Sequence, residues 1–458
     1  MSTFAERLKC ALADDADSTF VFLGNIEVEE QWALGEPGLP TISSQGARTV
    51  THRMDEFALL LGGPTDHVLL KTAPDSNFHA YLVDFGIALP QAHAVGAQQP
   101  GRTVTKDILE DPGTLAFLRD LGQKGAYLAP HGVSDLEQEV AERCGLRLAT
   151  SPADLCKRVN SKIFSRRLAD RLGIRQPVGM VSESPEELSE AVEFAKGVLN
   201  DGRKIVAKDA FGVSGKGVMV VDDQRRLEWL ERTAVRSYSR SGKTGMILEE
   251  WISKVKDLNY QVLVAKDGSV EFDFVKEAIT ENGVHKGHRI PAGLTSAQEA
   301  EVRSAGLAIG KALAEEGYRG VVGIDALVGT DEKVYPLTEI NARYNMSTYQ
   351  AKLQEAFMQK HSCAEARQYP LRLNARLPFA VLRKELGQLM VSSPGDAGII
   401  INNFATVNAV GEPPKGQKHF DGRMYAFLVG QDMESIAELD NRLVRKLAAI
   451  EKGETSQA

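Results

Sequence analysis

One segment of the sequence, residues 204–221 (KIVAKDAFGVSGKGVMVV), combines lysines, a serine and three glycines between two short apolar runs. The apolar runs predict a β-hairpin, and the glycines between them predict a flexible tip. Glycine lets backbone N–H groups come close to an anion, while hydroxyl and lysine side chains add donors and positive charge. The pattern therefore predicts a phosphate-binding tip. The residues that would form it are Lys208, Gly212, Ser214, Gly215, Lys216 and Gly217.

The segment follows neither of the two commoner phosphate-binding motifs. A P-loop needs a glycine five residues before its Gly-Lys pair and Ser or Thr after it, but the chain has Ala210 and Gly217 there. The dinucleotide-binding motif needs a helix after its glycines, whereas Val220 and Val221 continue a strand. A plain glycine-tipped hairpin without a ligand therefore remains an alternative at this point.

A second segment, residues 321–343 (VVGIDALVGTDEKVYPLTEINAR), carries acidic and amide side chains on another predicted hairpin. Asp325 ends the first predicted strand, and Glu339, Asn341 and Arg343 alternate along the second, so these three face one side. Carboxylate and amide oxygens suit Mg²⁺, which keeps water and phosphate oxygens as its other ligands. Arg343 could then offset charge that develops beside the ion. An exposed polar strand face is the alternative interpretation.

The composition bounds the class of protein. A chain of 458 residues predicts about three domains at ~100–200 residues each, and 43% apolar with 25% charged residues is typical of a soluble globular protein. No apolar run approaches the ~18 residues of a membrane span, and residues 1–18 lack the apolar centre of a secretory signal. We therefore expect a cytoplasmic protein without a membrane partner. The net charge of −8 also argues against nucleic acid as a partner.

The elements that must position the two segments divide the chain into three predicted domains. Residues 1–150 mix strand and helix patterns and predict an α/β domain. Residues 151–353 hold both segments, and residues 176–245 within them predict a small lid, because glycine-rich lids close over nucleotides and exclude water. Residues 354–458 predict a small α+β domain that includes an amphipathic helix near the C-terminal end.

In the first of these domains, strands are expected at residues 19–23, 67–71 and 80–85. A capping box formed by Ser134 and Glu137 predicts the start of a helix that follows a further strand, which makes a βαβ unit.

Two stretches in the second domain carry further candidates. A single helix expected at residues 154–172 carries Lys162. A loop expected at residues 279–294 (ITENGVHKGHRIPAGL) holds two histidines in an H-x-x-H pattern, followed by Arg289. Such a pair alone is weak evidence for a metal, so we favour a polar loop over a zinc site.

A lysine-bearing hairpin with a glycine tip, then LEEWI, then Asp325 and EINAR, is the order of parts found in the ATP-grasp superfamily. The chain resembles that superfamily over residues 162–343. Within it, the sequences NSKIFSRRLADRLGI and GHRIPAGL make the chain most similar to the peptide ligases of the pheganomycin type. The resemblance implies α/β and α+β architecture: an ATP-grasp fold with an N-terminal Rossmann-like pre-ATP-grasp domain, a small lid and a C-terminal α+β domain.

The resemblance also implies roles for individual residues. Lys162 and Lys208 match the two nucleotide-binding lysines, and the glycine-rich tip would lie over the β- and γ-phosphates. Asp257 stands where the family usually has a ribose-binding Glu, one methylene longer. The residues that match adenine-binding positions are Glu249 and the backbone of Glu250 and Ile252. The residues that match the magnesium ligands are Asp325, Glu339 and Asn341, and Arg343 matches the arginine that stabilises the reacting centre.

The implied activity is an ATP-dependent carboxylate–amine ligase that forms an amide or peptide bond through an acylphosphate. Two Mg²⁺ ions, for which Mn²⁺ can substitute, would act with Lys208, Lys216 and Arg343 on the transferring phosphoryl group. Arg343 or Arg289 would stabilise the oxyanion that forms when the amine attacks. The expected partners are a small carboxylic acid or amino acid and an amine, amino acid or peptide acceptor, in natural-product (antibiotic) biosynthesis.

Two alternatives to this activity stay open on the sequence. The acylphosphate could be passed to a thiol on a carrier protein, or the chain could be a nucleotide-binding regulator without turnover. The complete set of lysines, metal ligands and arginine argues against the regulator, because a protein that only binds a nucleotide does not need all of them. A homodimer is the default expectation for the oligomeric state.

Overall fold

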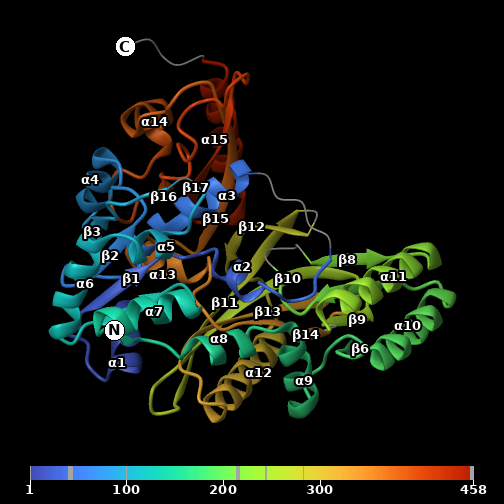
Figure 1. Cartoon of the computed structure of the whole chain (residues 1–458). Helices are drawn as coiled ribbons and strands as arrows, with labels where there is room; N and C mark the ends of the chain where they lie inside the picture. The colour runs from blue at the N-terminus through green and yellow to red at the C-terminus, as the bar shows by residue number, and fades with distance from the viewer. Residues whose placement is uncertain are drawn as a thin grey trace.

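The computed structural model describes residues 2–39, 45–99, 101–212, 217–242, 245–281 and 283–453. Its strands form three sheets (Figure 1). The first is parallel throughout, with the strand order β3-β2-β1-β4-β5. Three of its strands are fully buried, as expected for a parallel sheet covered on both faces. The bounds are β1 (Phe20–Leu23), β2 (His67–Leu70), β3 (Gln91–Ala94), β4 (Tyr127–Pro130) and β5 (Arg147–Leu148).

Helices cover this sheet and connect its strands. The predicted capping box is confirmed, since Ser134 and Glu137 open α7 (Asp135–Cys144) directly after β4. The other helices of this part are α1 (Phe4–Ala13), α2 (Val28–Trp32), α3 (Gln45–His52), η1 (Arg53–Leu60), α4 (Ser76–Asp84), α5 (Val104–Leu109) and α6 (Pro112–Gln123).

The prediction of a strand at residues 80–85 is wrong, because these residues lie in and just after α4. The Asp75 side chain accepts hydrogen bonds from the backbone of Asn77 and Phe78, which caps the helix. Phe78, Tyr81 and Leu82 are all buried, so the apolar residues follow helical spacing and cover the sheet from one helix face.

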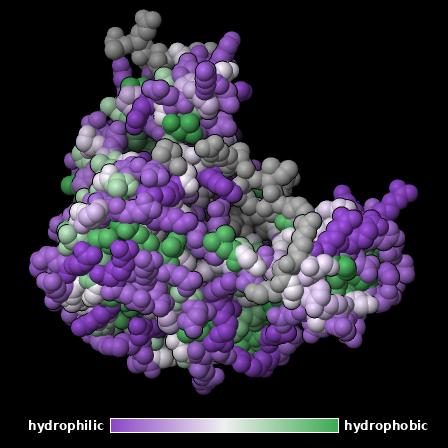
Figure 2. Space-filling model, viewed as in Figure 1, coloured by the Kyte–Doolittle hydropathy of each residue, from purple (hydrophilic) through white to green (hydrophobic). Residues whose placement is uncertain are grey.

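The second sheet, with the order β6-β9-β7-β8, forms with its helices a unit that we call the lid. The predicted hairpin is confirmed, because β7 and β8 pair antiparallel with Lys208 opposite Val218. Figure 2 shows the lid as a lobe that projects from the body of the molecule, with a largely hydrophilic surface. The lid elements are β6 (Gly179–Ser182), α10 (Pro185–Asn200), β7 (Ile205–Asp209), β8 (Val218–Val221), α11 (Gln224–Ser241) and β9 (Met246–Glu250).

The third sheet has eight strands in the order β14-β13-β10-β11-β12-β15-β17-β16. All its pairs are antiparallel. Helices α9 (Lys162–Leu172) and α12 pack on its first strands and α15 on its last. The bounds are β10 (Lys254–Val264), β11 (Val270–Glu281), β12 (Val284–Ile290), β13 (Gly320–Gly329), β14 (Val334–Asn341), β15 (Cys363–Leu373), β16 (Gly398–Asn403), β17 (Phe420–Gly430), α12 (Ser296–Glu315) and α15 (Met433–Glu451).

The last third of the chain therefore shares a sheet with the middle third. Pairing of β12 with β15 carries the sheet across the boundary expected near residue 354. The predicted C-terminal amphipathic helix is present as α15, which buries four apolar side chains. The first and last thirds also share one core, in which Phe57 meets Tyr425 edge-on and Phe78 meets Phe379 edge-on. The division into three domains stays a proposal.

The remaining elements connect these layers: α8 (Ala153–Val159), α9 (Lys162–Leu172), η2 (Thr348–Gln350), α13 (Ala351–Phe357), η3 (Met358–Lys360), α14 (Phe379–Leu386) and η4 (Gly387–Leu389). In the part of the chain that the structure describes, none of the helices has both the length and the apolar character needed to span a bilayer.

Candidate active site

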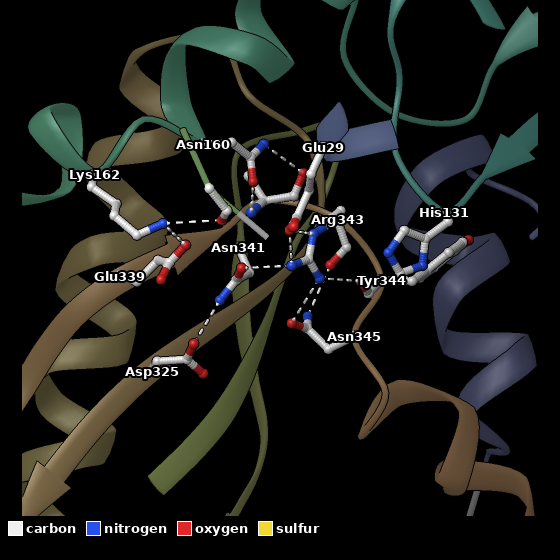
Figure 3. A network of polar contacts seen from close by, with 12 residues as sticks. Glu29, His131, Asn160, Lys162, Asp325, Glu339, Asn341, Arg343, Tyr344 and Asn345 are labelled. Carbon is white, nitrogen blue, oxygen red and sulfur yellow. Dashed lines mark hydrogen bonds and ion pairs between the residues drawn. The ribbon is translucent and has the colours of Figure 1, made fainter. Parts of the chain in front are cut away.

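The predicted metal ligands lie next to one another on the β13–β14 hairpin (Figure 3). Asp325 pairs directly with Glu339 across the two strands. The Asp325 carboxylate accepts hydrogen bonds from the side-chain amides of Asn341 at 3.0 Å and Asn259 of β10 at 2.8 Å. Burial, followed by the nearby Glu339 charge, raises the pKa of Asp325 to about 6. Two carboxylates and an amide thus converge on one face of the sheet.

Polar contacts from outside the sheet fix the end of β14. The Ser165 hydroxyl of α9 accepts a hydrogen bond from the backbone N–H of Ile340 at 3.0 Å. Asn160 binds both backbone groups of Ala342, accepting from its N–H at 2.9 Å and donating to its carbonyl at 3.3 Å. These contacts position the neighbouring side chains of Glu339, Asn341 and Arg343 because they immobilise the backbone between them.

Lys162 joins this hairpin to the glycine-rich segment. The single helix expected at residues 154–172 is divided into α8 and α9, so Lys162 is the first residue of α9. Its Nζ lies 2.6 Å from a Glu339 carboxylate oxygen and donates to the Gly212 carbonyl at 3.3 Å. Burial, the largest single effect, would lower the pKa of Lys162. The charge and hydrogen bond of Glu339, together with the charges of Glu29 and Asp325, outweigh burial, so the pKa is raised. The lysine therefore stays charged beside both segments.

Lys208 and Glu249 contact each other in the lid. Lys208 Nζ lies 2.5 Å from one Glu249 carboxylate oxygen, and Arg166 of α9 lies 3.0 Å from the other. Arg166 also donates to the carbonyls of Pro177 and Gly179, at 3.0 and 2.9 Å. The buried Arg166 side chain therefore connects α9 to the lid.

A cavity of about 290 Å³ lies between the third sheet and the lid hairpin. It is close to the lower end of the ~300–1,000 Å³ range of small-molecule sites. The predicted site residues that line it are Lys162, Gly212, Asp257, Asp325, Glu339, Asn341 and Arg343. Further polar residues on its wall are Glu29, Lys254, Asn259, Thr280, His285, His288, Thr338 and Asn345. Both sequence segments singled out for their chemistry thus meet at one cavity.

The described residues on either side of the predicted phosphate-binding tip reach this cavity, because Gly212 and Val218 both line it. Gly217 has a φ of 76°, which favours glycine. A Cβ atom at Gly217 would lie 2.6 Å from an Asp209 carboxylate oxygen, so a larger residue would also clash. The predicted contacts of Ser214, Gly215 and Lys216 lie outside the described residues.

The predicted adenine and ribose positions differ in their surroundings. The Asp257 carboxylate accepts hydrogen bonds from Lys254 and from Thr280, both at 2.6 Å, and lines the cavity. Glu250 pairs with Arg203 at 2.7 Å, and both residues lie with Ile252 on another surface groove. The assignment of Glu249, Glu250 and Ile252 to adenine binding stays a prediction.

Arg289 is held away from the cavity by two carboxylates. Its guanidinium lies 2.9 Å from Glu277 and 3.2 Å from Glu365, on the strands to either side. The expected loop at residues 279–294 is largely strand, formed by the end of β11 and by β12. These contacts favour a structural role for Arg289, and the catalytic role expected for it stays a prediction.

His285 and His288 line the cavity instead. Their Nε2 atoms lie 3.2 Å apart, and His288 Nδ1 lies 3.0 Å from the side-chain amide of Gln350. Burial lowers the pKa of His285 to about 4 and that of His288 well below its usual value, so both rings are neutral at neutral pH. No cluster of three or more His, Cys, Asp or Glu side chains suited to a metal occurs among the described residues. We assign no zinc to this pair.

Asp209 in the lid gives a testable pH dependence of stability. Its buried carboxylate accepts a hydrogen bond from the Leu39 N–H at 2.8 Å, and burial raises its pKa to about 7. A carboxyl with a raised pKa keeps its proton in the folded state after the unfolded chain has lost it. The free energy of unfolding therefore falls as the pH rises from about 4 to about 7 and stays lower above that.

We expect Asp209→Asn to raise the free energy of unfolding by about 1–3 kcal/mol at pH 8 and by much less at pH 5. The amide oxygen can still accept from Leu39, so the hydrogen bond is kept. Urea unfolding at both pH values measures the difference, with exposed Asp222→Asn as the matched control. An equal effect of Asp209→Asn at both pH values would contradict the pKa assignment.

Two family models match the chain. The Pre ATP-grasp domain matches residues 54–146, and the ATP binding domain of the carbamoyl-phosphate synthase L chain matches residues 162–352. The chain is an ATP-grasp ligase. The second match ends beyond Arg343 and begins at Lys162, so it spans the predicted nucleotide and metal residues. The closer similarity to pheganomycin-type ligases stays a prediction.

Comparisons with individual proteins agree with this assignment. The ligase is 25% identical over 368 residues to a [butirosin acyl-carrier protein]–L-glutamate ligase of Niallia circulans, a match that covers 80% of this chain and 82% of the relative.

Solved structures show the same fold. The carboxyaminoimidazole ribonucleotide synthase of Aspergillus clavatus, complexed with ATP, superposes with a TM-score of 0.52 at 14% identity, over 95% of this chain and 99% of the other. The biotin carboxylase domain of Hydrogenobacter thermophilus 2-oxoglutarate carboxylase, complexed with MgADP and bicarbonate, gives a TM-score of 0.51 at 15% identity, over 90% and 86%.

The residues of the cavity fit a magnesium–nucleotide complex. Mg²⁺ is usually bound by one or two carboxylates, with phosphate and water oxygens as its remaining ligands. Asp325, Glu339 and the Asn341 amide supply such a set, and Lys162 already binds the same Glu339. Mg²⁺ on Glu339 would release Lys162 for a phosphate, so each charge of the cavity would keep an opposite partner.

Proposed function

We propose that this ATP-grasp ligase activates a carboxylic acid as its acylphosphate and transfers the acyl group to an amine, with release of ADP and phosphate. The observation that supports this most strongly is the contact of Lys162 with both Glu339 and Gly212. It places the acidic hairpin and the glycine-rich segment at one cavity. A site that activates a carboxylate with ATP needs phosphate-binding and metal-binding groups next to each other.

Each of the two steps forms one bond and breaks another. A carboxylate oxygen of the acid attacks the γ-phosphorus of ATP, and the bond from that phosphorus to the β-phosphate oxygen breaks, so ADP leaves. The nitrogen of the acceptor then attacks the acyl carbon and loses a proton. The bond from that carbon to the phosphate oxygen breaks, and phosphate leaves with the electron pair.

The side chains have distinct tasks in these steps. Lys162 and Lys208 would bind and orient the phosphates, and Arg343 would stabilise the oxyanion that forms on the acyl carbon. Asp325, Glu339 and Asn341 would hold Mg²⁺. Bound there, the metal would offset negative charge on the phosphates, as it does in other phosphoryl-transfer enzymes.

The name of one relative favours a second kind of acceptor, a carrier protein. The name of the Niallia circulans protein gives an acyl-carrier protein as one substrate and L-glutamate as the other. A carrier protein presents a thiol, so the same acylphosphate would yield a thioester. Amine and thiol acceptors share the first half-reaction and differ only in the attacking atom.

An acceptor screen tests the proposal. Purified ligase, Mg²⁺ and ATP are combined with each of the twenty amino acids and with hydroxylamine, a small amine that captures acylphosphates. ADP release that requires both acid and hydroxylamine, with a hydroxamate seen by mass spectrometry, is the expected result. ADP release without any acyl product, or AMP as the nucleotide product, would contradict it. Replacing hydroxylamine by a phosphopantetheinylated carrier protein then separates the thiol acceptor from the amine.

The remaining expectations from the sequence are part of this proposal: two metal ions with Mn²⁺ as a substitute, a role in natural-product biosynthesis, a homodimer, and a cytoplasmic location.

A further inference from the structure

Every N–H group of the Arg343 guanidinium is already engaged (Figure 3). Nε and Nη2 donate to one carboxylate oxygen of Glu29, the former at 2.7 Å. Nη2 also donates to Asn341 at 2.8 Å, and Nη1 donates to the Tyr344 carbonyl at 3.0 Å and to Asn345 at 3.4 Å. A guanidinium has five N–H donors. An incoming carboxylate or oxyanion must therefore replace one of these partners.

Glu29 is the charged partner, and it comes from a distant part of the chain. It belongs to α2, a short helix that is fixed to the body because buried Trp32 donates to the Val133 carbonyl at 2.9 Å. The side chains of Glu29 and Arg343 are only 13% and 14% exposed, and both line the cavity. All the described contacts of the Glu29 carboxylate fall on Oε1. Within the described ranges, its Oε2 has no hydrogen-bond partner.

A simple carboxylate would bind here at an electrostatic cost. If its oxygens replaced Glu29 at Arg343, Glu29 would keep its charge in a largely buried place with no direct ion-pair partner among the described residues, which is unfavourable. A substrate that also brings an ammonium group avoids this cost, because the ammonium group can pair with Glu29. The two protein charges lie side by side, which matches an ammonium group and a carboxylate on the same carbon atom.

The other charged pairs of the cavity are already assigned. Lys162 binds Glu339 beside the predicted metal position, and Lys254 binds Asp257 at the predicted ribose position. Glu29 and Arg343 thus form the one pair of opposite charges on the described cavity wall that the nucleotide and its metal do not use.

We propose that the acid substrate is an α-amino acid, whose carboxylate binds Arg343 and whose ammonium group binds Glu29. This inference rests on the proposed ligase function and adds the class of the acid. Binding of the amino acid separates Glu29 from Arg343, so the guanidinium becomes available beside the reacting carboxylate only when the correct substrate is present. An acid without an ammonium group cannot replace Arg343 as the positively charged partner of Glu29.

Substrate binding to Glu29→Gln tests this directly. Isothermal titration of the ligase, saturated with Mg²⁺ and the non-hydrolysable nucleotide AMP-PNP, is carried out with the twenty L-amino acids, beginning with L-glutamate. The amino acid that binds most tightly is then compared with the corresponding acid that lacks the amino group. Glu30→Gln is the matched control, because Glu30 is the next residue of the same helix and is not on the cavity wall.

The expected result is a change of preference. Glu29→Gln should weaken binding of the amino acid at least tenfold and leave binding of the deaminated acid unchanged or stronger, since Arg343 is no longer neutralised by a carboxylate. Glu30→Gln should bind both compounds as the unaltered ligase does. A fold defect in Glu29→Gln would weaken both compounds and AMP-PNP alike, so it cannot mimic this change.

Three results would overturn the inference. The first is that the unaltered ligase and Glu29→Gln bind the amino acid equally well. The second is that Glu29→Gln loses affinity for both compounds equally while it still binds AMP-PNP, and the third is that none of the twenty amino acids binds. If the ligase binds AMP-PNP and releases ADP only with acids that lack an amino group, the inference fails while the ligase function stands. If it binds no AMP-PNP with Mg²⁺, the proposed function itself fails.

Discussion

Replacement of Arg343 by alanine is expected to reduce kcat about 100- to 1000-fold, the usual effect of removing one group that stabilises developing charge at a reacting centre. The guanidinium lies on the cavity wall beside Asn341, so it can reach an oxyanion next to the metal position. Steady-state ADP release at saturating ATP and acid measures the loss. The affinity for AMP-PNP should change by less than about threefold, because the proposed phosphate contacts come from the lysines.

Arg343→Lys is the matched variant for this prediction. It keeps the positive charge but has no planar fork of N–H donors, so it cannot hold two oxygens at once. We expect its kcat to lie between those of the unaltered ligase and Arg343→Ala. Thermal unfolding of both variants shows whether they are folded. Near-normal turnover of a folded Arg343→Ala variant would refute the assigned role.

Replacement of Glu339 by alanine should have an effect of similar size, about 100- to 1000-fold on kcat/KM for ATP, and should raise the Mg²⁺ concentration needed for half-maximal rate. The substitution removes one predicted metal ligand and also the carboxylate that binds Lys162 at 2.6 Å. Both the metal and the lysine would then be less well positioned for the phosphates. Initial rates measured over a range of Mg²⁺ concentrations separate the metal effect from a general loss of activity.

Glu332→Gln provides the control for Glu339→Ala. Glu332 is exposed in the turn between β13 and β14, at the far end of the same hairpin. Its substitution removes a carboxylate charge without touching the cavity, so rate and Mg²⁺ dependence should not change. A Glu339→Ala variant with the Mg²⁺ dependence of the unaltered ligase would show that Glu339 is not a metal ligand.

Local patterns in the sequence were sufficient for the two hairpins. Strand alternation correctly put Glu339 and Asn341 on one face, and Asp325 lies opposite Glu339 because the two strands are close in sequence and pair through a short turn. The expectation that Asp325 ends its strand is wrong, since β13 continues to Gly329. The glycine-separated apolar runs likewise gave β7 and β8. Capping residues identified α7 for the same reason, since a cap depends on neighbours within one helical turn.

Contacts between distant parts of the chain were not predictable in this way. Glu29 lies 314 residues before Arg343, and its helix has only five residues, too few for a periodic signal. Arg166 has the sequence context of an exposed helix face, yet it is buried against Glu249, 83 residues later. No local pattern reports which element will pack over a polar side chain. The apolar run at residues 80–85 led to the wrong prediction of a strand, because a short apolar run is equally compatible with a strand and with a buried helix.

The transfer of an oxygen atom from substrate to phosphate tests the central claim most directly. The acid that gives the highest rate in the hydroxylamine screen is labelled with ¹⁸O in its carboxylate, and the products are analysed by mass spectrometry. Attack of that carboxylate on the γ-phosphorus predicts ADP and inorganic phosphate that carries one ¹⁸O atom for each amide bond formed. Label in AMP, or phosphate released without label, would contradict carboxylate activation by γ-phosphoryl transfer at this cavity.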